Sequence, residues 1–348
     1  MINRVDTDEF LRLAQQHPVL DVRSPGEYAH AHIPGAYNLP LFTDEERKVT
    51  GTIYKQQSRE KAIKAGLDFY GPKMRPMVEQ AEAILKSSSK GKILLIHCWR
   101  GGMRSAGVAW LMDLYGFKVY TLAGGYKAYR QWVLQKLTTP YLYTVVGGYT
   151  GSGKTALLQQ LAALGEQILD LEGAAGHRGS AFGALGMPAQ PGQEQFENTL
   201  AMHLSSADPA KRIWIEDESR RIGNVNVPAG LWENIRKAHV YFLDIPADAR
   251  LALIVKDYGK YRIEELAANI MRIRKRLGGL ATRDALGFLA EGNHQECFRI
   301  LLSYYDRFYR HDIQSRDNYD LQVTHLQAES TDAAANAALL METSSRHD

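Results

Sequence analysis

A cysteine and two arginines lie in one short segment, residues 93–105 (ILLIHCWRGGMRS). The segment begins with an apolar run that predicts a buried strand, and after a glycine-containing loop it leads into the helical run 105–114. Where a helix follows a strand in this way, loop N–H groups and the positive end of the helix can converge on one point, which lowers the pKa of a thiol and binds an oxyanion. Arg100 and Arg104 add positive charge there. We therefore predict a reactive thiolate at Cys98, although a small packing residue is the simpler interpretation of a lone cysteine.

Five other motifs in the first third of the chain resemble those of the rhodanese (sulfurtransferase) family. They are Asp21-Val-Arg, Glu27-Tyr, His32-Ile-Pro-Gly-Ala36, Asn38-Leu-Pro and Leu122-Ala-Gly-Gly-Tyr126. Together with the Cys98 loop they extend over about residues 1–136. The resemblance implies a rhodanese-like fold in which Cys98 carries sulfur or selenium as a persulfide-type adduct.

The spacing within the loop also fits a second chemistry. His97 and Cys98 are followed by five residues and then Arg104, the pattern of cysteine-dependent phosphatases, including those with a rhodanese fold. In such enzymes a thiolate attacks a phosphate ester with the help of the arginine. The loop length does not decide between the two chemistries, but it indicates a cradle large enough for a tetrahedral anion such as selenophosphate.

Residues 148–155 (GYTGSGKT) match the phosphate-binding pattern G-x-x-x-x-G-K-[ST] at every fixed position, between an apolar strand and a helical run. The residues expected to bind phosphate are Gly148, Gly151, Ser152, Gly153, Lys154 and Thr155. Loop N–H groups would surround a diphosphate, Lys154 would pair with its oxygens, and Thr155 would hold Mg²⁺. The same geometry serves any diphosphate, so the ligand stays open.

Further candidate residues follow two predicted strands of the same region. Glu216, Asp217 and Asp170 are candidate metal ligands or acids, because carboxylates at strand ends organise the metal in this kind of fold. His177 and Arg178 lie in a glycine-rich segment at the expected carboxyl edge of the sheet, where open α/β sheets bind ligands, and could reach an anion. Each of these residues could also be an ordinary surface group.

The chain has 348 residues, enough for about two domains with cores of their own. Short apolar runs alternate with helical segments, which is typical of parallel α/β sheets. The expected strands are 19–22, 93–96 and 119–122, then 142–146, 168–171, 213–215 and 240–243. The pattern breaks at 136–140. We therefore predict a rhodanese-like domain of residues 1–137 and a P-loop NTPase-like domain of residues 138–348. After Pro246 we expect no further strands in the second domain but a helical C-terminal extension. A last short helix is expected at 332–341.

Composition and charge narrow the class of protein. The net charge of +3 does not by itself indicate a nucleic-acid-binding protein. No apolar run reaches about 18 residues and the N-terminal residues lack the apolar core of a secretion signal, so we expect a cytoplasmic protein without a membrane span. Two cysteines cannot form a disulfide framework or a zinc cluster. Cys297 lies on a helical apolar stripe and is predicted to be an inert packing residue.

Positive charge is concentrated between residues 256 and 276, where seven lysines or arginines face three acidic residues. The basic residues are Lys256, Lys260, Arg262, Arg272, Arg274, Lys275 and Arg276. With Tyr258 and Tyr261 interleaved, the segment suits a phosphate backbone and stacked bases, as in RNA binding. A solvated helix face explains the same residues equally well.

The order of the motifs is similar to that of the tRNA 2-selenouridine synthase family. The Cys98 loop comes first, then GYTGSGKT, then LDLEGAAGHRGS at 169–180. The resemblance implies a transferase that converts 2-thiouridine at the wobble position of tRNA to 2-selenouridine through S-geranyl-2-thiouridine. It implies geranyl diphosphate and selenophosphate as substrates, and a thiolated tRNA and a selenophosphate supply as partners. Two other interpretations stay open: a cysteine-dependent phosphatase or kinase-like regulatory enzyme, and a nucleotide-gated, non-catalytic RNA-binding protein.

Overall fold

The computed structural model describes residues 2–88, 91–314 and 322–345. The chain forms two compact units, one of residues 1–136 with 197–202 and the other of residues 137–196 with 203–348. The division after residue 136 lies beside the boundary predicted from the sequence. The segment 197–202 belongs to helix α10 (Gln193–Ser205), and the sequence analysis placed it in the second domain. Its Asn198 is fully buried and donates hydrogen bonds to the Tyr126 hydroxyl and the His32 carbonyl, which explains why it groups with the first unit.

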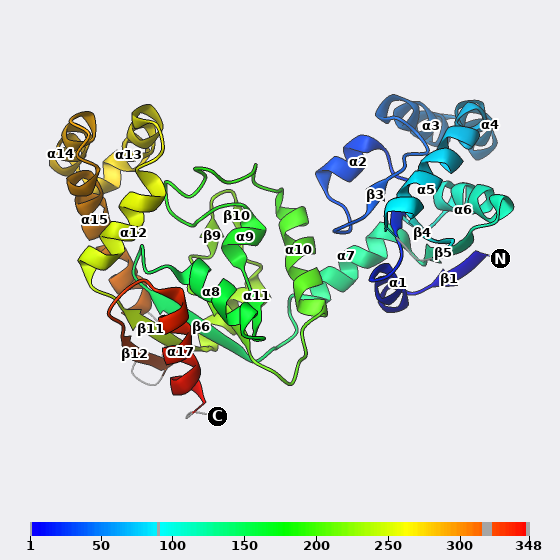
Figure 1. The fold of residues 1–348 in the computed structure, drawn as a ribbon. Helices are drawn as coiled ribbons and strands as arrows, with labels where there is room; N and C mark the ends of the chain where they lie inside the picture. Colours follow the sequence, from blue (N-terminus) through cyan, green and yellow to red (C-terminus); the bar gives the residue numbers. More distant parts are fainter. Residues whose placement is uncertain (1, 89–90, 315–321, 346–348) are drawn as a thin grey trace. The chain divides into compact units, whose positions relative to one another are not determined.

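The first unit contains a parallel five-stranded sheet in the order β1-β5-β4-β2-β3. Its strands are β1 (Ile2–Val5), β2 (Val19–Asp21), β3 (Tyr37–Asn38), β4 (Ile93–His97) and β5 (Lys118–Leu122). Its helices are α1 (Thr7–Ala14), α2 (Pro25–His30), α3 (Asp44–Gln56), α4 (Arg59–Tyr70), α5 (Met74–Ser88), α6 (Met103–Tyr115) and α7 (Gly125–Lys136), with a 3₁₀ turn at Gly71–Lys73 (Figure 1). β4 is central and almost entirely buried, as expected for a continuous apolar run in a parallel sheet. The sequence analysis missed β1 and β3, which form the two edges.

The second unit contains another parallel five-stranded sheet, in the order β12-β11-β6-β8-β7. Its strands are β6 (Tyr143–Gly148), β7 (Gln167–Leu169), β8 (Ile213–Glu216), β11 (His239–Asp244) and β12 (Val323–Gln327), and a small hairpin joins β9 (Arg221–Ile222) to β10 (Val225–Asn226). The helices near this sheet are α8 (Lys154–Ala163), α9 (Leu171–Ala175), α11 (Ala229–Lys237) and α17 (Ala333–Ser344). The last of these confirms the short helix predicted near the C-terminus, and Asp332 caps it.

The prediction that no strand follows Pro246 is wrong. β12 pairs in parallel with β11, with Val323 opposite Val240 and Leu326 opposite Leu243. β12 forms one edge of the sheet, and its pattern of burial is mixed rather than uniformly buried. An edge strand of this kind does not need a continuous apolar run, so the apolar signal that identifies a central strand is missing.

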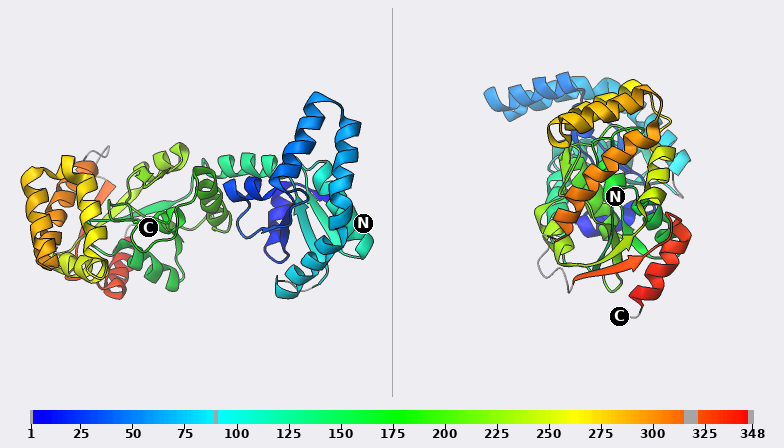
Figure 2. Two further views of the ribbon diagram at one scale, coloured as in Figure 1. Left: turned by 90° about the horizontal axis from the view of Figure 1, so that it is seen from above. Right: turned by 90° about the vertical axis from the view of Figure 1, so that its left-hand side faces the viewer.

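Four helices form the predicted extension between β11 and β12: α12 (Ala247–Tyr258), α13 (Ile263–Leu277), α14 (Gly279–Ala290) and α15 (His294–Gln314). They lie together, yellow to orange in Figures 1 and 2. Leu266, Ile270 and Leu277 of α13 pack in one apolar core with Cys297 of α15, which confirms the packing position predicted for this cysteine. Among the described residues, none of the helices combines the length and the apolar character that crossing a membrane requires.

Candidate functional site

Cys98 follows β4 directly and lies before α6, as the sequence predicts. The residue is 3% exposed, and its Sγ lies 3.3 Å from Ser105 Oγ, which is also within hydrogen-bond distance of the Gly102 carbonyl at 3.1 Å, so that the one hydroxyl proton can point to either. Burial opposes ionisation, but hydrogen bonds from the side chain and backbone of Ser105, the charge of Arg104 and the backbone of Gly102 together lower the pKa of Cys98. Sequence reasoning missed Ser105. A hydroxyl in the first turn of the helix after a candidate nucleophile is a signal that could have identified it.

The two arginines of the loop have different environments. Arg104 Nη1 and Nη2 donate to Glu27 Oε2 and Oε1 at 2.6 and 3.3 Å. Burial opposes ionisation of Glu27, yet the hydrogen bonds and charge of Arg104 hold the pKa of this carboxyl below its usual value. Arg100 is exposed. The guanidinium of Arg104 is therefore oriented by Glu27, a residue that the family-like motif contains but for which the sequence suggested no role.

A buried polar cluster supports the loop from behind. The Arg23 guanidinium donates to Asp21 Oδ2 at 2.6 Å and lies 3.8 Å from the centre of the Tyr126 ring. His97 Nε2 is 3.7 Å from the same carboxylate, and burial, opposed by the charge of Asp21, lowers the pKa of His97. Tyr126 in turn donates its backbone N–H to the Cys98 carbonyl at 2.9 Å. Several rhodanese-like motifs therefore meet in one support beneath the thiol loop.

Residues 148–155 run from the last residue of β6, through a loop, into the first turn of α8. Gly148, Gly151 and Gly153 have φ angles of 153°, 79° and 78°, a region that favours glycine. Lys154 Nζ donates to the Gly148 carbonyl at 3.0 Å. Ser152 is buried, and within the part of the chain that the structure describes its Oγ has no hydrogen-bond partner. The structure therefore places the phosphate loop in the strand–loop–helix context that its motif requires.

The carboxyl groups near this loop form a more extensive group than predicted. Thr155 Oγ1 donates to Glu172 Oε2 at 2.8 Å, and the Glu172 N–H donates to Glu216 Oε1 at 2.8 Å. Burial, with the charges of Asp170 and Glu172, raises the pKa of the fully buried Glu216 to about 8. Glu218 also has a pKa well above its usual value, because of desolvation first and then of Glu172, with which it shares a hydrogen bond. Glu172 and Glu218 lie in the predicted strand-end segments but were not among the predicted site residues.

The other two predicted carboxylates have defined local partners. Asp170 caps α9, since its Oδ1 accepts from the Gly173 N–H at 2.6 Å. Asp217 follows β8, is almost fully buried, and accepts a hydrogen bond of 2.5 Å from the Tyr309 hydroxyl. The capping role explains why an aspartate occupies position 170 without requiring a metal.

Thr155, Glu172 and Asp217 offer the hard oxygen ligands that Mg²⁺ prefers. Across residues 2–88, 91–314 and 322–345, no three or more His, Cys, Asp or Glu side chains are grouped so as to hold a metal ion. Mg²⁺ usually takes only one or two carboxylates from a protein and the remaining ligands from phosphates and water. The residues present therefore fit a Mg²⁺ ion that binds together with a diphosphate.

His177 and Arg178 follow α9. His177 is buried, and burial, opposed by Glu172, lowers its pKa. The Arg178 guanidinium lies 5.9 Å from the centre of the Tyr258 ring. His177 is thus close enough to Glu172 to feel its charge. Arg178 instead packs against Tyr258 of the helical extension.

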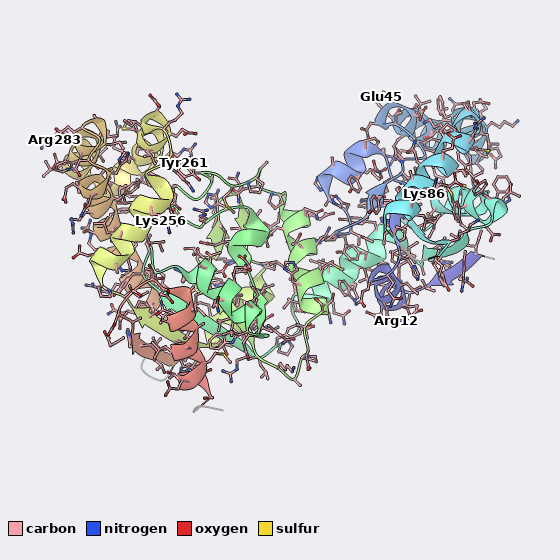
Figure 3. The ribbon with its side chains drawn as sticks, in the orientation of Figure 1. Arg12, Glu45, Lys86, Lys256, Tyr261 and Arg283 are labelled. Atoms are coloured by element: carbon pink, nitrogen blue, oxygen red, sulfur yellow. The ribbon has the colours of Figure 1, made fainter. Side chains whose placement is uncertain are left out.

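The basic segment, residues 256–276, has exposed charges, and its two tyrosines are partly buried. Lys256, Lys260, Arg272, Lys275 and Arg276 are all exposed. The Tyr258 ring packs 6.0 Å from Phe182, and the Tyr261 hydroxyl donates to the Leu185 carbonyl at 3.2 Å. Figure 3 shows Lys256 on α12 and Tyr261 in the turn that follows. In this structure both tyrosines pack, partly buried, against the apolar core that includes Ala181, Phe182 and Leu185.

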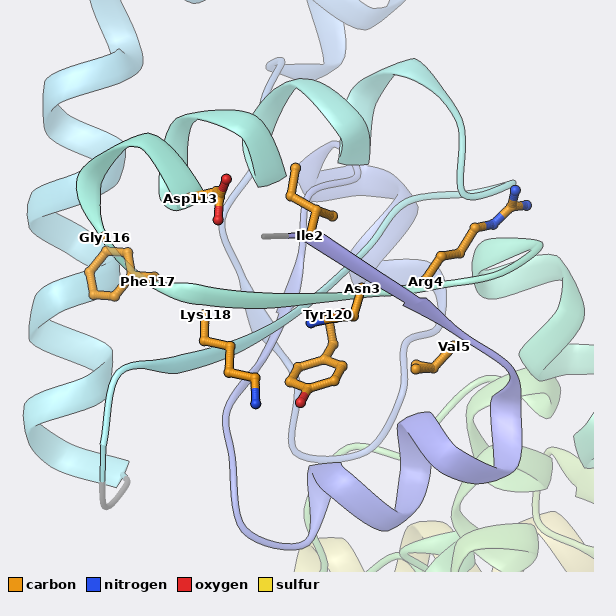
Figure 4. A pocket seen from close by; sticks show the side chains of 9 residues that line it. All are labelled: Ile2, Asn3, Arg4, Val5, Asp113, Gly116, Phe117, Lys118 and Tyr120. Atoms are coloured by element: carbon orange, nitrogen blue, oxygen red, sulfur yellow. The ribbon is translucent and has the colours of Figure 1, made fainter.

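A pocket in the first unit lies at the edge of the sheet (Figure 4). Its lining residues are Ile2, Asn3, Arg4, Val5, Asp113, Gly116, Phe117, Lys118 and Tyr120. They come from β1, β5 and the C-terminal end of α6, and none belongs to the thiol loop or the phosphate loop. The candidate chemistry therefore does not use this pocket.

Comparison with known proteins finds a family match in each of the two units. The family described as the tRNA 2-selenouridine synthase AAA domain matches residues 142–337, and the rhodanese-like domain matches residues 6–131. A tRNA 2-selenouridine synthase of Hydrogenovibrio crunogenus is 34% identical over 345 residues, which cover 89% of this chain and 93% of that protein. One of Serratia proteamaculans is 35% identical over 348 residues, 90% of this chain and 91% of that protein. The chain therefore belongs to the tRNA 2-selenouridine synthase family.

Proposed function

We propose that this protein converts 2-thiouridine at the wobble position of tRNA into 2-selenouridine through S-geranyl-2-thiouridine, using geranyl diphosphate and selenophosphate. The observation that carries the proposal is that one chain of this family holds two unlike sites. One is the thiol of Cys98, with its lowered pKa, and the other is the phosphate loop at 148–155. Each site suits one of the two half-reactions.

The phosphate loop suits the alkylation. The sulfur of 2-thiouridine attacks the first carbon of the geranyl group, the carbon–oxygen bond breaks, and diphosphate leaves with the electron pair. Lys154 and the loop N–H groups stabilise the charge that develops on diphosphate, so the step needs no ATP hydrolysis. Thr155 and Asp217 would hold Mg²⁺, which supplies further charge neutralisation when bound.

The thiol loop suits the exchange of selenium for sulfur. The Cys98 thiolate attacks the phosphorus of selenophosphate, while Arg100, Arg104 and the loop N–H groups bind its oxygens. The phosphorus–selenium bond breaks, and the selenide released displaces geranylthiol from the nucleoside. Water then hydrolyses the phosphocysteine to phosphate. Selenium keeps one oxidation level throughout, so this route needs no oxidant or reductant. Formation of a sulfur–selenium bond at Cys98 would instead need a two-electron oxidant.

Nucleoside mass spectrometry tests the proposal. A 2-thiouridine-containing tRNA is incubated with geranyl diphosphate, selenophosphate and either the wild-type protein or Cys98→Ser. We expect 2-selenouridine only with the wild type, and accumulation of the geranylated nucleoside with the variant. Equal loss of both steps in Cys98→Ser would indicate a structural role for the cysteine, and absence of both products with bound tRNA would contradict the proposal.

Competition between ligands tests the assignment of the phosphate loop. Geranyl diphosphate should displace labelled pyrophosphate from the wild-type protein more effectively than ATP does. A strong preference for ATP with no binding of geranyl diphosphate would contradict the assignment and favour a nucleotide-gated RNA-binding protein.

A phosphatase is the second candidate, because Glu27 holds Arg104 with both guanidinium nitrogens near a cysteine of lowered pKa. It requires release of phosphate from a generic aryl phosphate, and the release must depend on Cys98. Turnover of the aryl phosphate without any selenation of tRNA would favour this candidate.

A further inference from the structure

Helix α15 of the extension reaches the phosphate loop through Tyr309. The Tyr309 hydroxyl donates to Asp217 Oδ2 at 2.5 Å and accepts from the Gly148 N–H at 3.4 Å. It therefore joins the first glycine of the loop to the acid that follows β8. The Tyr309 ring centre is 5.4 Å from Lys154 Nζ and 5.8 Å from the Tyr149 ring centre.

A second residue of the same helix face acts on the loop indirectly. Asp306 lies three residues before Tyr309, so the two side chains project from neighbouring turns. Asp306 accepts hydrogen bonds of 2.9 and 2.8 Å from the two terminal nitrogens of Arg250. Arg250 is 3% exposed, and one of these nitrogens also donates to the Thr150 carbonyl at 3.0 Å. Two side chains of α15 therefore support residues of the phosphate loop.

The Tyr309 hydroxyl both donates and accepts a hydrogen bond. A phenol has one proton to donate, and here it goes to a carboxylate, the stronger kind of acceptor. The hydroxyl oxygen accepts from a backbone N–H at the same time. A phenylalanine would pack against the same rings. The contacts of the Tyr309 ring therefore do not account for its hydroxyl group.

We propose that Tyr309 is a positioning residue of the diphosphate site, which fixes the Asp217 carboxylate for a metal ion that would bind with the diphosphate and sets the position of the loop at Gly148. The identity of the ligand rests on the proposed function, but the effect on the loop does not. The helical extension is in this respect part of the phosphate site rather than an appendage to it.

The first experiment uses the full-length protein without ligand. Tyr309→Phe keeps the ring and removes the hydroxyl. Tyr115→Phe is the matched control, because its hydroxyl also donates to a carboxylate, Glu82, at 2.7 Å, and it is the last residue of α6 in the first unit, outside the phosphate loop. Amide hydrogen exchange of peptides covering 143–155 should become about tenfold faster in Tyr309→Phe, as expected for loss of a hydrogen bond to a charged group, and should not change in the control.

Peptides from β8 and from the core of α13 serve as internal references for the second unit. Unchanged exchange at 143–155 would overturn the proposal. Equal acceleration in the loop and in the reference peptides would also overturn it, because it would show that the hydroxyl only contributes to general stability.

The second experiment measures binding of inorganic pyrophosphate by calorimetry as Mg²⁺ is varied. Tyr309→Phe should raise the Mg²⁺ concentration needed for half-maximal binding about tenfold. When Asp217→Asn is already present, adding Tyr309→Phe should change this concentration little, because the two residues act together. Independent, additive effects would contradict the proposal. If the wild type binds no pyrophosphate, the proposed function fails, and the exchange experiment still decides the role of Tyr309 in the loop.

Discussion

The thiol of Cys98 and the thiol of Cys297 are both almost fully buried, at 3% and 1% exposure, but their acidities move in opposite directions. Burial raises the pKa of Cys297 to about 11, since an apolar environment disfavours the thiolate. The same burial acts on Cys98, yet Ser105, Arg104 and Gly102 reverse it. The opposite pKa shifts of the two cysteines therefore come from a set of hydrogen bonds and one nearby charge at Cys98.

Replacement of Ser105 tests this set of interactions. In Ser105→Ala the side-chain hydrogen bond is removed, so the pKa of Cys98 should rise and its alkylation by iodoacetamide should require a higher pH. Mass spectrometry of the Cys98 peptide across a pH series measures the midpoint, the pH at which alkylation reaches half its maximal rate, without interference from Cys297. Ser105→Thr, which keeps a hydroxyl, should restore the midpoint toward that of the wild type. An unchanged midpoint in Ser105→Ala would mean that Arg104 and the backbone account for the acidity.

At the scale of elements, the start of α7 determines where the thiol loop lies. The N–H groups of Tyr126 and Lys127 donate to the Cys98 and Trp99 carbonyls, both at 2.9 Å. Gly125 has a φ of +61°, and a Cβ on it would lie 2.3 Å from the Cys98 carbonyl oxygen. A glycine is required there because two backbone segments approach too closely for a side chain.

A pair of glycine substitutions separates backbone strain from this close approach. Gly116→Ala, at a φ of +102° with no atom within 4 Å of the added Cβ, should cost about 1 kcal/mol of unfolding free energy. Gly125→Ala should cost at least about 2 kcal/mol and should also slow alkylation of Cys98, because backbone atoms of the loop must move. Urea unfolding and the alkylation rate measure the two effects. Equal costs and an unchanged rate would show that the loop does not depend on Gly125.

At the scale of the whole molecule, charge is distributed unevenly. The net charge is only +3, yet the basic segment carries seven lysines or arginines. Its two tyrosines, Tyr258 and Tyr261, pack partly buried against residues 181–185. The sequence analysis raised RNA binding for this segment; if the segment binds tRNA, binding should depend strongly on the phosphate backbone and therefore on salt.

Matched removal of three lysines tests this expectation. Lys256, Lys260 and Lys275 are exposed in the basic segment, and Lys55, Lys61 and Lys64 are exposed on α3 and α4. Changing the first three to Gln should weaken tRNA binding and make its salt dependence less steep, by about 0.7 to 0.9 in logarithmic slope for each phosphate that is no longer neutralised. The second triple variant, with the same change in net charge, should bind as the wild type does. Equal weakening by both would indicate an effect of overall charge alone.

Local pattern was sufficient for the two loops and for most of the strands around them. Both loops are short segments in which residue type and spacing carry the information, and central parallel strands are continuous apolar runs. The same reasoning failed for β1, β3 and β12, which are edge strands and need no such run. It also did not indicate what Tyr258 and Tyr261 contact, because a residue's own neighbours in sequence do not reveal which distant loop it packs against.

The sequence by itself determined the fold class and the order of the two domains, and it singled out Cys98 as a candidate reactive thiol and residues 148–155 as a candidate phosphate loop. Only the tertiary structure decided which side chains complete these sites. Glu27 orients Arg104 from 77 residues away, and Tyr309 binds Asp217 from 92 residues away. Such pairs are set by the order of strands in a sheet and by the packing of helices on it. They leave no periodic signal in the chain, because the pairing depends on where two elements meet rather than on their local sequence.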